Sequence, residues 1–330
     1  VGGGIFVEES SPKLKHLHIT NNKNTIQYGG GIFFGYKSDA SLEYSTVDSN
    51  QAALWGGGIG VFSLADVKLD SVLIKNNKSV SGGGYANPKA AASELRDVRV
   101  MSNEATDFGG GIYIGGQGWN YSKLYNILVS ENSANIKGGG IYLLHSKNKA
   151  HFYDSIIKKN HSDVGGGLYV QDADPTFERT IFKENDATKG GGIYVYKHSV
   201  LLTLINTLIY GNTATQYGGG IHTLNRPVLK FFHSTIFDNP CEACDGDGED
   251  SGIFANKGSK IYFYNSIFWA GPGSEKIKFS GGHASYKGEF EARNSIVKGL
   301  ASIEHSDDHD TIDYDATSFD TDPYFYDPGS

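Results

Sequence analysis

A short acidic run near residue 245 holds the side chains best suited to bind a metal ion. Ca²⁺ takes six to eight oxygen ligands, often from flexible loops. The run begins like an EF-hand calcium loop, but Asn256 stands where that loop has its last acidic ligand. Calcium is one interpretation, and a solvated acidic loop without a cofactor is the other. The four candidate ligands are Asp245, Asp247, Glu249 and Asp250.

The chain has two cysteines, Cys241 and Cys244, at the start of the same run. A zinc site would need two further ligands at a suitable spacing. A thioredoxin-type motif would need a strand followed by a helix, and no helical pattern surrounds these residues. The spacing therefore predicts a local disulfide, which persists in an oxidising compartment.

Aromatic residues recur at one position in most repeats and could bind sugars. Four of them follow an aliphatic residue in consecutive repeats and are expected to face outward as one strip. Tyrosine offers a flat apolar area with a polar tip, which suits stacking on a sugar ring. The alternative is that the stacked rings only stabilise a sheet through cross-strand pairs. The four residues of this tyrosine strip are Tyr113, Tyr142, Tyr169 and Tyr194.

An enzyme acting on acidic polysaccharides is a second interpretation. A lyase would need carboxylates that hold Ca²⁺ near an arginine or lysine base, and an inverting hydrolase needs two carboxylates about 6.5–9.5 Å apart. The few arginines do not share a column with acids, and Arg96-Asp97-Val98-Arg99 is the best candidate. An exposed ion pair within a strand explains that segment equally well. We therefore assign no catalytic residue from the sequence.

The elements that would position these residues come from a repeat of 25 to 29 residues. Each unit opens with three glycines and an aliphatic residue, and a period of this size is typical of a solenoid. Short alternating apolar segments follow, as in Gly190 to Asn212, which we interpret as three strands and three turns. The first glycines of the nine clear copies are Gly2, Gly29, Gly56, Gly82, Gly109, Gly138, Gly165, Gly190 and Gly218.

An asparagine precedes each later glycine block and marks a turn. Stacked at one place on coils about 4.8 Å apart, the amides could donate and accept along the axis as a ladder. Asparagine also tolerates left-handed backbone, while glycine allows coils to approach closely. The expected fold is all-β, a right-handed parallel β-helix of about eleven or twelve coils. The predicted ladder is Asn22, Asn50, Asn77, Asn103, Asn132, Asn160, Asn185 and Asn212, with Asn239 as a further copy.

Four segments are expected from the regularity of the repeat. Residues 1–239 form regular coils, and 240–252 form the acidic insertion that contains the cysteines. Residues 253–303 form less regular coils, and 304–330 form an acidic tail or cap. The chain begins inside a repeat, which indicates a mature or excised fragment of a longer protein.

The composition limits the possible cellular location of the protein and its possible binding partners. The 330 residues carry a net charge of −8, so there is no basic surface for nucleic acid. No apolar run approaches the roughly 20 residues of a membrane span. Three sequons, at Asn77, Asn120 and Asn160, could carry glycans, although inward-facing amides at Asn77 and Asn160 would be unavailable. We predict an extracellular or cell-surface location.

The paired signatures resemble the repeats of the chlamydial polymorphic outer membrane protein family, written GGA[ILV] and FxxN. Here the third small residue is glycine, and only Phe182-Lys183-Glu184-Asn185 matches the second box literally. The resemblance covers roughly residues 1–240. It implies a parallel β-helix at a cell surface that serves as an adhesin or a stalk, and it carries no catalytic residue.

We therefore predict a non-catalytic structural or adhesive β-helix segment of a larger surface or filament protein. Its expected partners are other copies or flanking modules of the same protein, or surface glycans and host receptors. The alternatives are a polysaccharide lyase or hydrolase on acidic glycans, and a glycan-binding module that uses the tyrosine strip.

Overall fold

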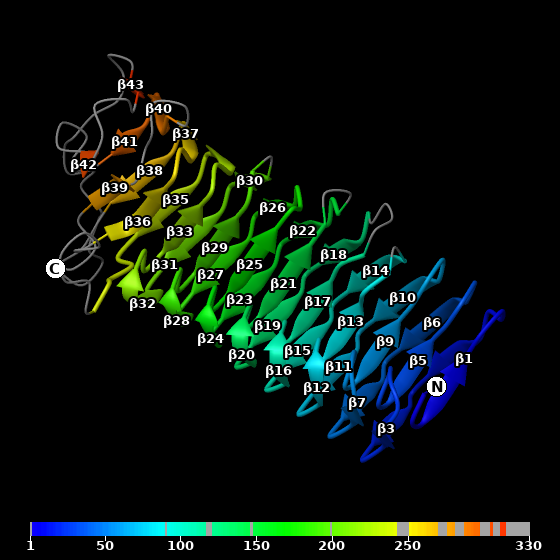
Figure 1. The fold of residues 1–330 in the computed structure, drawn as a ribbon. Coiled ribbons are helices and arrows are strands. Elements are labelled where there is room, and N and C mark those ends of the chain that lie inside the picture. Colours follow the sequence, from blue (N-terminus) through cyan, green and yellow to red (C-terminus); the bar gives the residue numbers. More distant parts are fainter. Residues whose placement is uncertain are drawn as a thin grey trace, which may run out of the picture.

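The computed structural model describes residues 2–89, 91–116, 121–145, 148–198, 200–242, 251–269, 276–280, 287–297, 304–305 and 311–314. These ranges contain short strands and turns but no helix, and so no helix that could cross a membrane. All strand pairs are parallel, and corresponding strands of successive coils lie side by side in an elongated stack (Figure 1). The predicted all-β, right-handed parallel β-helix is confirmed.

Four sheets run along the stack, and each regular coil adds one strand to each of them. Sheet A consists of β1 (Ile5–Val7), β5 (Ile32–Phe34), β9 (Ile59–Val61), β13 (Tyr85–Asn87), β17 (Ile112–Ile114), β21 (Ile141–Leu144), β25 (Leu168–Gln171), β29 (Ile193–Tyr196), β33 (Ile221–Leu224), β36 (Ser251–Asn256), β39 (Lys276–Ser280) and β42 (Glu304–His305). Sheet B consists of β2 (Lys13–Lys15), β6 (Asp39–Glu43), β10 (Asp66–Asp70), β14 (Ala92–Arg96), β18 (Lys123–Tyr125), β22 (His151–Tyr153), β26 (Thr176–Glu178), β30 (Leu201–Ile205), β34 (Val228–Phe232), β37 (Lys260–Tyr264), β40 (Glu289–Arg293) and β43 (Thr311–Tyr314).

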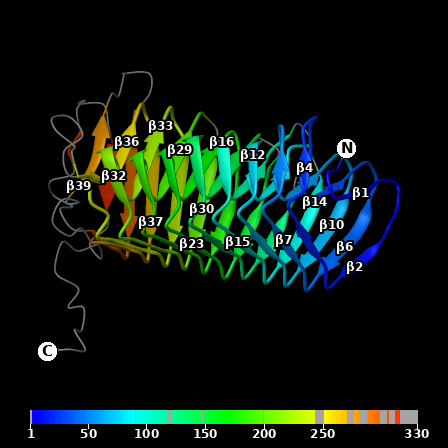
Figure 2. The ribbon, with the colours of Figure 1, turned by 90° about the horizontal axis from the view of Figure 1, so that it is seen from below.

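The remaining two sheets are shorter. Sheet C consists of β3 (His18–Thr20), β7 (Thr46–Asp48), β11 (Leu73–Lys75), β15 (Arg99–Met101), β19 (Leu128–Ser130), β23 (Ile156–Lys158), β27 (Ile181–Lys183), β31 (Leu208–Tyr210), β35 (Thr235–Phe237), β38 (Ile267–Trp269) and β41 (Ile296–Val297). Sheet D consists of β4 (Lys23–Asn24), β8 (Gln51–Ala52), β12 (Lys78–Ser81), β16 (Glu104–Phe108), β20 (Ser133–Lys137), β24 (His161–Val164), β28 (Asp186–Lys189) and β32 (Thr213–Tyr217). Figure 2 shows strands of sheets A and C, such as β29 and β23, on opposite faces of the stack.

Sheet D corrects the prediction of three strands per coil. Its strands lie between the ladder asparagine and the next glycine block, where we expected only a turn. They alternate exposed polar residues with buried small ones, as in Glu104-Ala105, and so carry little apolar signal. Their pairing with the next coil, such as Ala134 with Ser162, makes them strands.

The main core fills the space enclosed by sheets A, B and C. Inward residues of neighbouring coils lie directly opposite each other, as Ile112 does with Ile141, and both are fully buried. Asn87 is a polar residue buried in this core, and its amide is satisfied locally, because it donates to the carbonyl oxygen of Ala91 at 2.7 Å. The Thr223 hydroxyl is buried without a partner among the described residues.

The asparagines form one continuous ladder at the turn between sheets C and D. Each side-chain nitrogen donates to the side-chain oxygen of the next asparagine, at 2.8–3.0 Å, from Asn22 to Asn239. The same oxygen also accepts the backbone N–H of the previous asparagine, as between Asn103 and Asn132. The left-handed backbone falls one residue earlier than expected, for example at Ser102 with φ 52°, which corrects the predicted role of the asparagine itself.

The three glycines of a block are each required for a different structural reason, as Gly82, Gly83 and Gly84 show. Gly82 has a left-handed backbone with φ 65°. A Cβ on Gly83 would lie 2.5 Å from the carbonyl oxygens of both Glu104 and Gly110 in the next coil. A Cβ on Gly84 would lie 2.9 Å from the side-chain nitrogen of Asn103. The block and the ladder therefore belong to one packing arrangement.

The less regular end departs from the predicted segment boundaries. Strand β36 begins at Ser251, inside the segment assigned to the insertion, and pairs with β33. Strands β42 and β43 lie in the segment assigned to a tail, yet they continue sheets A and B. The repeat pattern has faded there, but backbone pairing persists.

Candidate functional site

The four predicted tyrosines stack in a row but do not form an open strip. Their rings lie 5.1–5.3 Å apart between centroids. They face away from the main core, as expected, yet are only 2% to 8% exposed. Phe108 and Val164, at the ends of sheet D strands, pack against the row. The exposed strip is therefore a wrong prediction, because sheet D helps to turn its residues into a second hydrophobic core: Tyr113, Tyr142, Tyr169 and Tyr194.

The other predicted sites divide between buried and undescribed residues. Asn77 and Asn160 are fully buried in the ladder, so these two sequons are not accessible for glycosylation, as expected for inward-facing amides. Cys241 is disulfide-bonded. The third sequon, the second cysteine and the four calcium candidates lie outside the described residues: Asn120, Cys244, Asp245, Asp247, Glu249 and Asp250.

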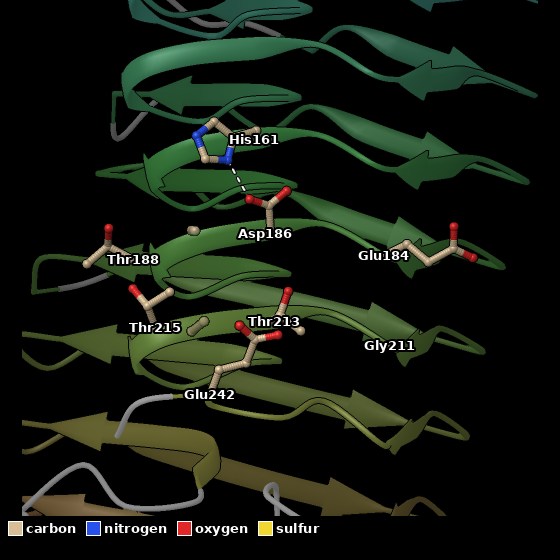
Figure 3. Close-up of a pocket in the computed structure, with 10 residues that line it drawn as sticks. His161, Glu184, Asp186, Thr188, Gly211, Thr213, Thr215 and Glu242 are labelled. Carbon is tan, nitrogen blue, oxygen red and sulfur yellow. Dashed lines mark hydrogen bonds and ion pairs between the residues drawn. The ribbon is translucent and has the colours of Figure 1, made fainter. Parts of the chain in front are cut away.

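A groove of about 500 Å³ crosses the outer face of sheet D over β24, β28 and β32 (Figure 3). From Asn22 to Asn212, the residue directly after each ladder asparagine starts a sheet D strand and places an exposed or half-buried side chain there. His161, Asp186 and Thr213 are neighbours in this column. The polar lining of the groove consists of His161, Glu184, Asp186, Thr188, Thr213, Thr215 and Glu242.

The order of the side chains along this column does not suit nucleophilic catalysis. His161 Nδ1 contacts Asp186 Oδ2 across the coils, and both side chains are more than half exposed. A serine-protease-like triad needs the imidazole between the carboxylate and the hydroxyl. Here Asp186 stands between His161 and Thr213. The contact is an exposed cross-strand pair, like Lys78 with Glu104 in the same column, and such pairs contribute little stability.

Glu184 also lies at the groove, but its environment is the opposite of that of a general acid. Its carboxylate lies 3.3 Å from Lys183 Nζ and 3.6 Å from Lys159 Nζ. The hydrogen bond from Lys183 lowers the pKa of Glu184. A glycosidase general acid needs a raised pKa. Within the described residues, no group of three or more His, Cys, Asp or Glu side chains could hold a metal ion.

The arginine segment singled out from the sequence forms a surface pair. Arg96 Nε lies 2.5 Å from Glu94 Oε1, and its guanidinium lies 4.1 Å from the ring centre of Tyr125. The exposed-pair interpretation of this segment holds, although the partner is Glu94 and not Asp97.

Sequence reasoning missed the groove because it missed sheet D. Aligning the repeats on the ladder asparagine would have found it, since the next residue defines the outward column. That column runs Lys78, Glu104, Ser133, His161, Asp186 and Thr213.

His222 continues the tyrosine row and lies buried in it. It pairs in register with Tyr194 on one side and Phe254 on the other, and it is 4% exposed. Neither ring nitrogen has a hydrogen-bond partner among the described residues. Burial, and secondarily the charge of Lys189, lower the pKa of His222 to about 3, because the charged imidazole would lose its hydration. The imidazole is therefore neutral at pH 7.

We expect His222→Phe to stabilise the protein, most strongly in acid. The unfolded histidine binds a proton near pH 6.5, whereas folded His222 binds one only near pH 3. Between these values the unfolded state holds more protons, so the parent loses about 1.4 kcal/mol of unfolding free energy per pH unit of acidification. Phenylalanine lacks this term. At pH 7 the variant still gains about 1–3 kcal/mol, because it buries no unpaired polar group.

Urea denaturation of both proteins at pH 7 and pH 4.5 measures this. The difference in unfolding free energy should grow by about 2–3 kcal/mol on acidification. Tyr194→Phe is the control, since it removes a hydroxyl whose pKa burial has raised to about 12, and it should keep the parental pH dependence. A difference that does not change with pH would contradict a neutral buried imidazole.

The comparison with known protein families agrees with this fold. Residues 89–268 match the family model described as the right-handed beta helix region, which is more than half of the chain. The chain therefore belongs to the right-handed β-helix family. Among solved structures, the crystal structure of pectate lyase Pel9A is similar with a TM-score of 0.45 and 11% identity, covering 89% of this chain and 72% of that chain.

This structural likeness carries no inference about activity. A search of curated proteins gives no match to this sequence. The specific resemblance to GGA[ILV] and FxxN repeats stays a prediction.

Proposed function

We propose that this chain is a non-catalytic β-helix module of an extracellular protein, with a structural and adhesive role. The observation that carries the proposal is the asparagine ladder, which joins nine coils without interruption from Asn22 to Asn239. Every amide in the interior of the ladder is tied to both neighbouring coils. Such a body bends little, so it suits a spacer that holds other surfaces at a fixed distance.

The dimensions support this role. Twelve strands of sheet A at about 4.8 Å spacing give a rod of roughly 50 Å. Charged side chains also pair along the axis, as Lys15 does with Glu43 at 2.6 Å and Arg179 with Asp154 at 2.6 Å. The disulfide of Cys241 supports an extracellular location, because such bonds persist in oxidising compartments.

The groove on sheet D does not favour the enzyme alternative on acidic glycans. Its walls present the carboxylates of Glu184, Asp186 and Glu242, and these repel a uronate polymer. Neutral glycans and protein surfaces remain compatible with this face, which agrees with an adhesive role.

Immuno-electron microscopy of intact source cells tests the proposal. We expect labelling at the cell surface or along surface filaments without permeabilisation. Labelling that requires permeabilised cells would contradict the extracellular role. In parallel, purified protein should release no product from polygalacturonate or alginate, and cleavage of either polymer would establish the enzyme alternative instead.

A further inference from the structure

Exposed apolar side chains are concentrated around sheet A. Of the nine large hydrophobic residues that are exposed in the described part of the chain, seven lie in sheet A or in the segments that lead into and out of its strands. The other two are Tyr44, at the turn between sheets B and C, and Ile156 on sheet C. This uneven distribution indicates an interaction surface on the sheet A side. Its seven exposed residues are Phe6, Ile26, Tyr36, Leu54, Leu64, Tyr121 and Ile136.

The most exposed of these side chains lie at turns on both edges of sheet A. Ile26 is 72% exposed in the segment that leads from β4 into β5, and Leu64 is 62% exposed in the turn that follows β9. Leu54 lies in the segment that leads into β9, and Tyr36 lies in the turn that follows β5. The glycine block and the sheet A strand lie between each entering turn and the next leaving turn. The exposed apolar side chains therefore form two separate rows.

Aromatic rings in mutual contact fill the space between the two rows. The Tyr28 ring lies 5.2 Å from that of Trp55 and 4.8 Å from that of Phe62, measured between centroids. Phe33 packs against Tyr28 and Phe62 and is buried. The surface is therefore an aromatic floor with a row of exposed apolar side chains along each edge.

Two lysines of this surface hold their charge over an aromatic ring and not beside a carboxylate. The Nζ of Lys37 lies 4.9 Å from the ring centre of Tyr36, and the Nζ of Lys89 lies 5.1 Å from the ring centre of Phe62. Neither lysine forms an ion pair within the residues that the structure describes. Both ammonium groups are therefore able to pair with anionic groups of a partner, while the rings beneath them keep apolar contact with it.

We propose that this face binds the surface of a phospholipid bilayer, with the rod lying on its sheet A side. The two rows of apolar side chains would insert at the boundary between headgroups and acyl chains. The rings of Tyr28 and Trp55 suit the level of the headgroups, where amphipathic aromatic side chains are enriched. Lys37 and Lys89 would meet the lipid phosphates. The proposal goes beyond the structural role, and vesicle binding by purified protein tests it whatever the location of the module.

The arrangement of the surface favours a bilayer over a folded protein partner. A protein interface buries one packed apolar core inside a polar rim, whereas here the exposed apolar side chains lie in two rows. A fluid bilayer needs no matching cavities and accepts such side chains wherever they lie. Glu8 and Glu9 follow β1 on this side, and the Glu9 backbone N–H donates to the Tyr36 carbonyl at 2.9 Å. Because these acids offset the lysines, apolar insertion supplies most of the affinity, and we expect little dependence on lipid charge.

Co-sedimentation of the purified full chain with phosphatidylcholine vesicles tests the proposal. A second set of vesicles contains about one quarter phosphatidylglycerol. We expect the protein to bind both sets at millimolar lipid, with affinities within about threefold of each other. Brominated phosphatidylcholine should also quench the fluorescence of Trp55, which is identified as the signal that is lost in Trp55→Phe.

Matched variants locate the contact. Leu64→Asp should weaken vesicle binding at least about fivefold, because it removes an inserted apolar side chain and adds a charge. Leu54→Asp should have a similar effect from the other row. Tyr44→Asp and Ile156→Asp are the controls, because they also replace exposed hydrophobic residues with a carboxylate, but away from sheet A. Both controls should bind like the parent, and circular dichroism confirms that each variant is folded.

Four results would overturn the proposal. Failure to sediment with either set of vesicles would exclude a bilayer as the partner. Binding to phosphatidylglycerol vesicles alone, lost at high salt, would mean electrostatic adsorption without insertion. Equal weakening by Leu64→Asp and Ile156→Asp would place the contact elsewhere. A lipid-free dimer in light scattering that Leu64→Asp dissociates would identify this face as a contact between copies of the protein.

Discussion

Gly83→Ala is expected to abolish folding of the β-helix, or to lower its unfolding free energy by at least about 4 kcal/mol. A Cβ at this position would lie 2.5 Å from the carbonyl oxygens of Glu104 and Gly110, and 2.7 Å from the carbonyl carbon of Glu104. All three are backbone atoms of the next coil, so no side chain can rotate away. Relief of the clash requires the coils to separate, which breaks the ladder hydrogen bonds beside it. Thermal and urea unfolding followed by far-ultraviolet circular dichroism measures the loss.

Gly211→Ala separates this steric effect from backbone strain. Gly211 has a left-handed φ of 61°, but its Cβ would meet no heavy atom closer than 4.0 Å. The expected cost is about 1–2 kcal/mol, that of a left-handed non-glycine residue. If Gly83→Ala costs no more than Gly211→Ala, the close packing of glycine against the next coil is refuted.

Asn132→Ala is expected to cost about 4 kcal/mol, and the loss should be cooperative over neighbouring coils. Asn132 Oδ1 accepts from both the backbone and the side chain of Asn103, at 2.9 and 3.0 Å. Its Nδ2 donates to the Val100 carbonyl at 2.9 Å and to Asn160 Oδ1 at 3.0 Å. Alanine removes all four bonds and leaves buried groups unpaired, at about 1–3 kcal/mol each when no water can reach them. Equilibrium urea denaturation provides the measurement.

Two further variants show that hydrogen bonding causes the loss. Asn132→Asp keeps the size and the acceptor, but it loses both donors and buries a carboxylate against two oxygens. It should be at least as destabilised as alanine at pH 7, and less so at pH 4, where a protonated carboxyl can donate again. Ser133→Ala changes the neighbouring half-buried residue and should stay within about 0.5 kcal/mol of the parent. Equal effects of Asn132→Ala and Ser133→Ala would refute the energetic role of the ladder.

Backbone pairing between coils also limits what could be predicted from the sequence near the C-terminal end of the chain. Strands β42 and β43 contain no glycine block or ladder asparagine, so no repeated residue marks them. They are strands because their backbone pairs with β39 and β40. Backbone pairing needs no particular side chain, and it therefore leaves little trace in a single sequence.

The sequence alone determined the coil, its length and the place of the asparagine ladder. These features depend on positions in the coil where only one type of residue fits. Glycine is required where coils touch, and an amide is required to donate and accept at once. Such residues repeat visibly along the chain, so the repeat itself assigns Gly83 and Asn132 their places in the coil.

Only the tertiary structure decided which outward faces are open. Most residues of the sheet D strands are small or polar, and the apolar ones at the strand ends, such as Phe108 and Val164, do not by their pattern show that they fold back over Tyr142 and its neighbours. Whether an outward-facing ring is exposed depends on which other segment packs against it. That contact depends on how the two segments are placed in space, and neither segment's own sequence shows it. For the same reason, the sequence does not show that both ring nitrogens of His222 are buried without a partner among the described residues.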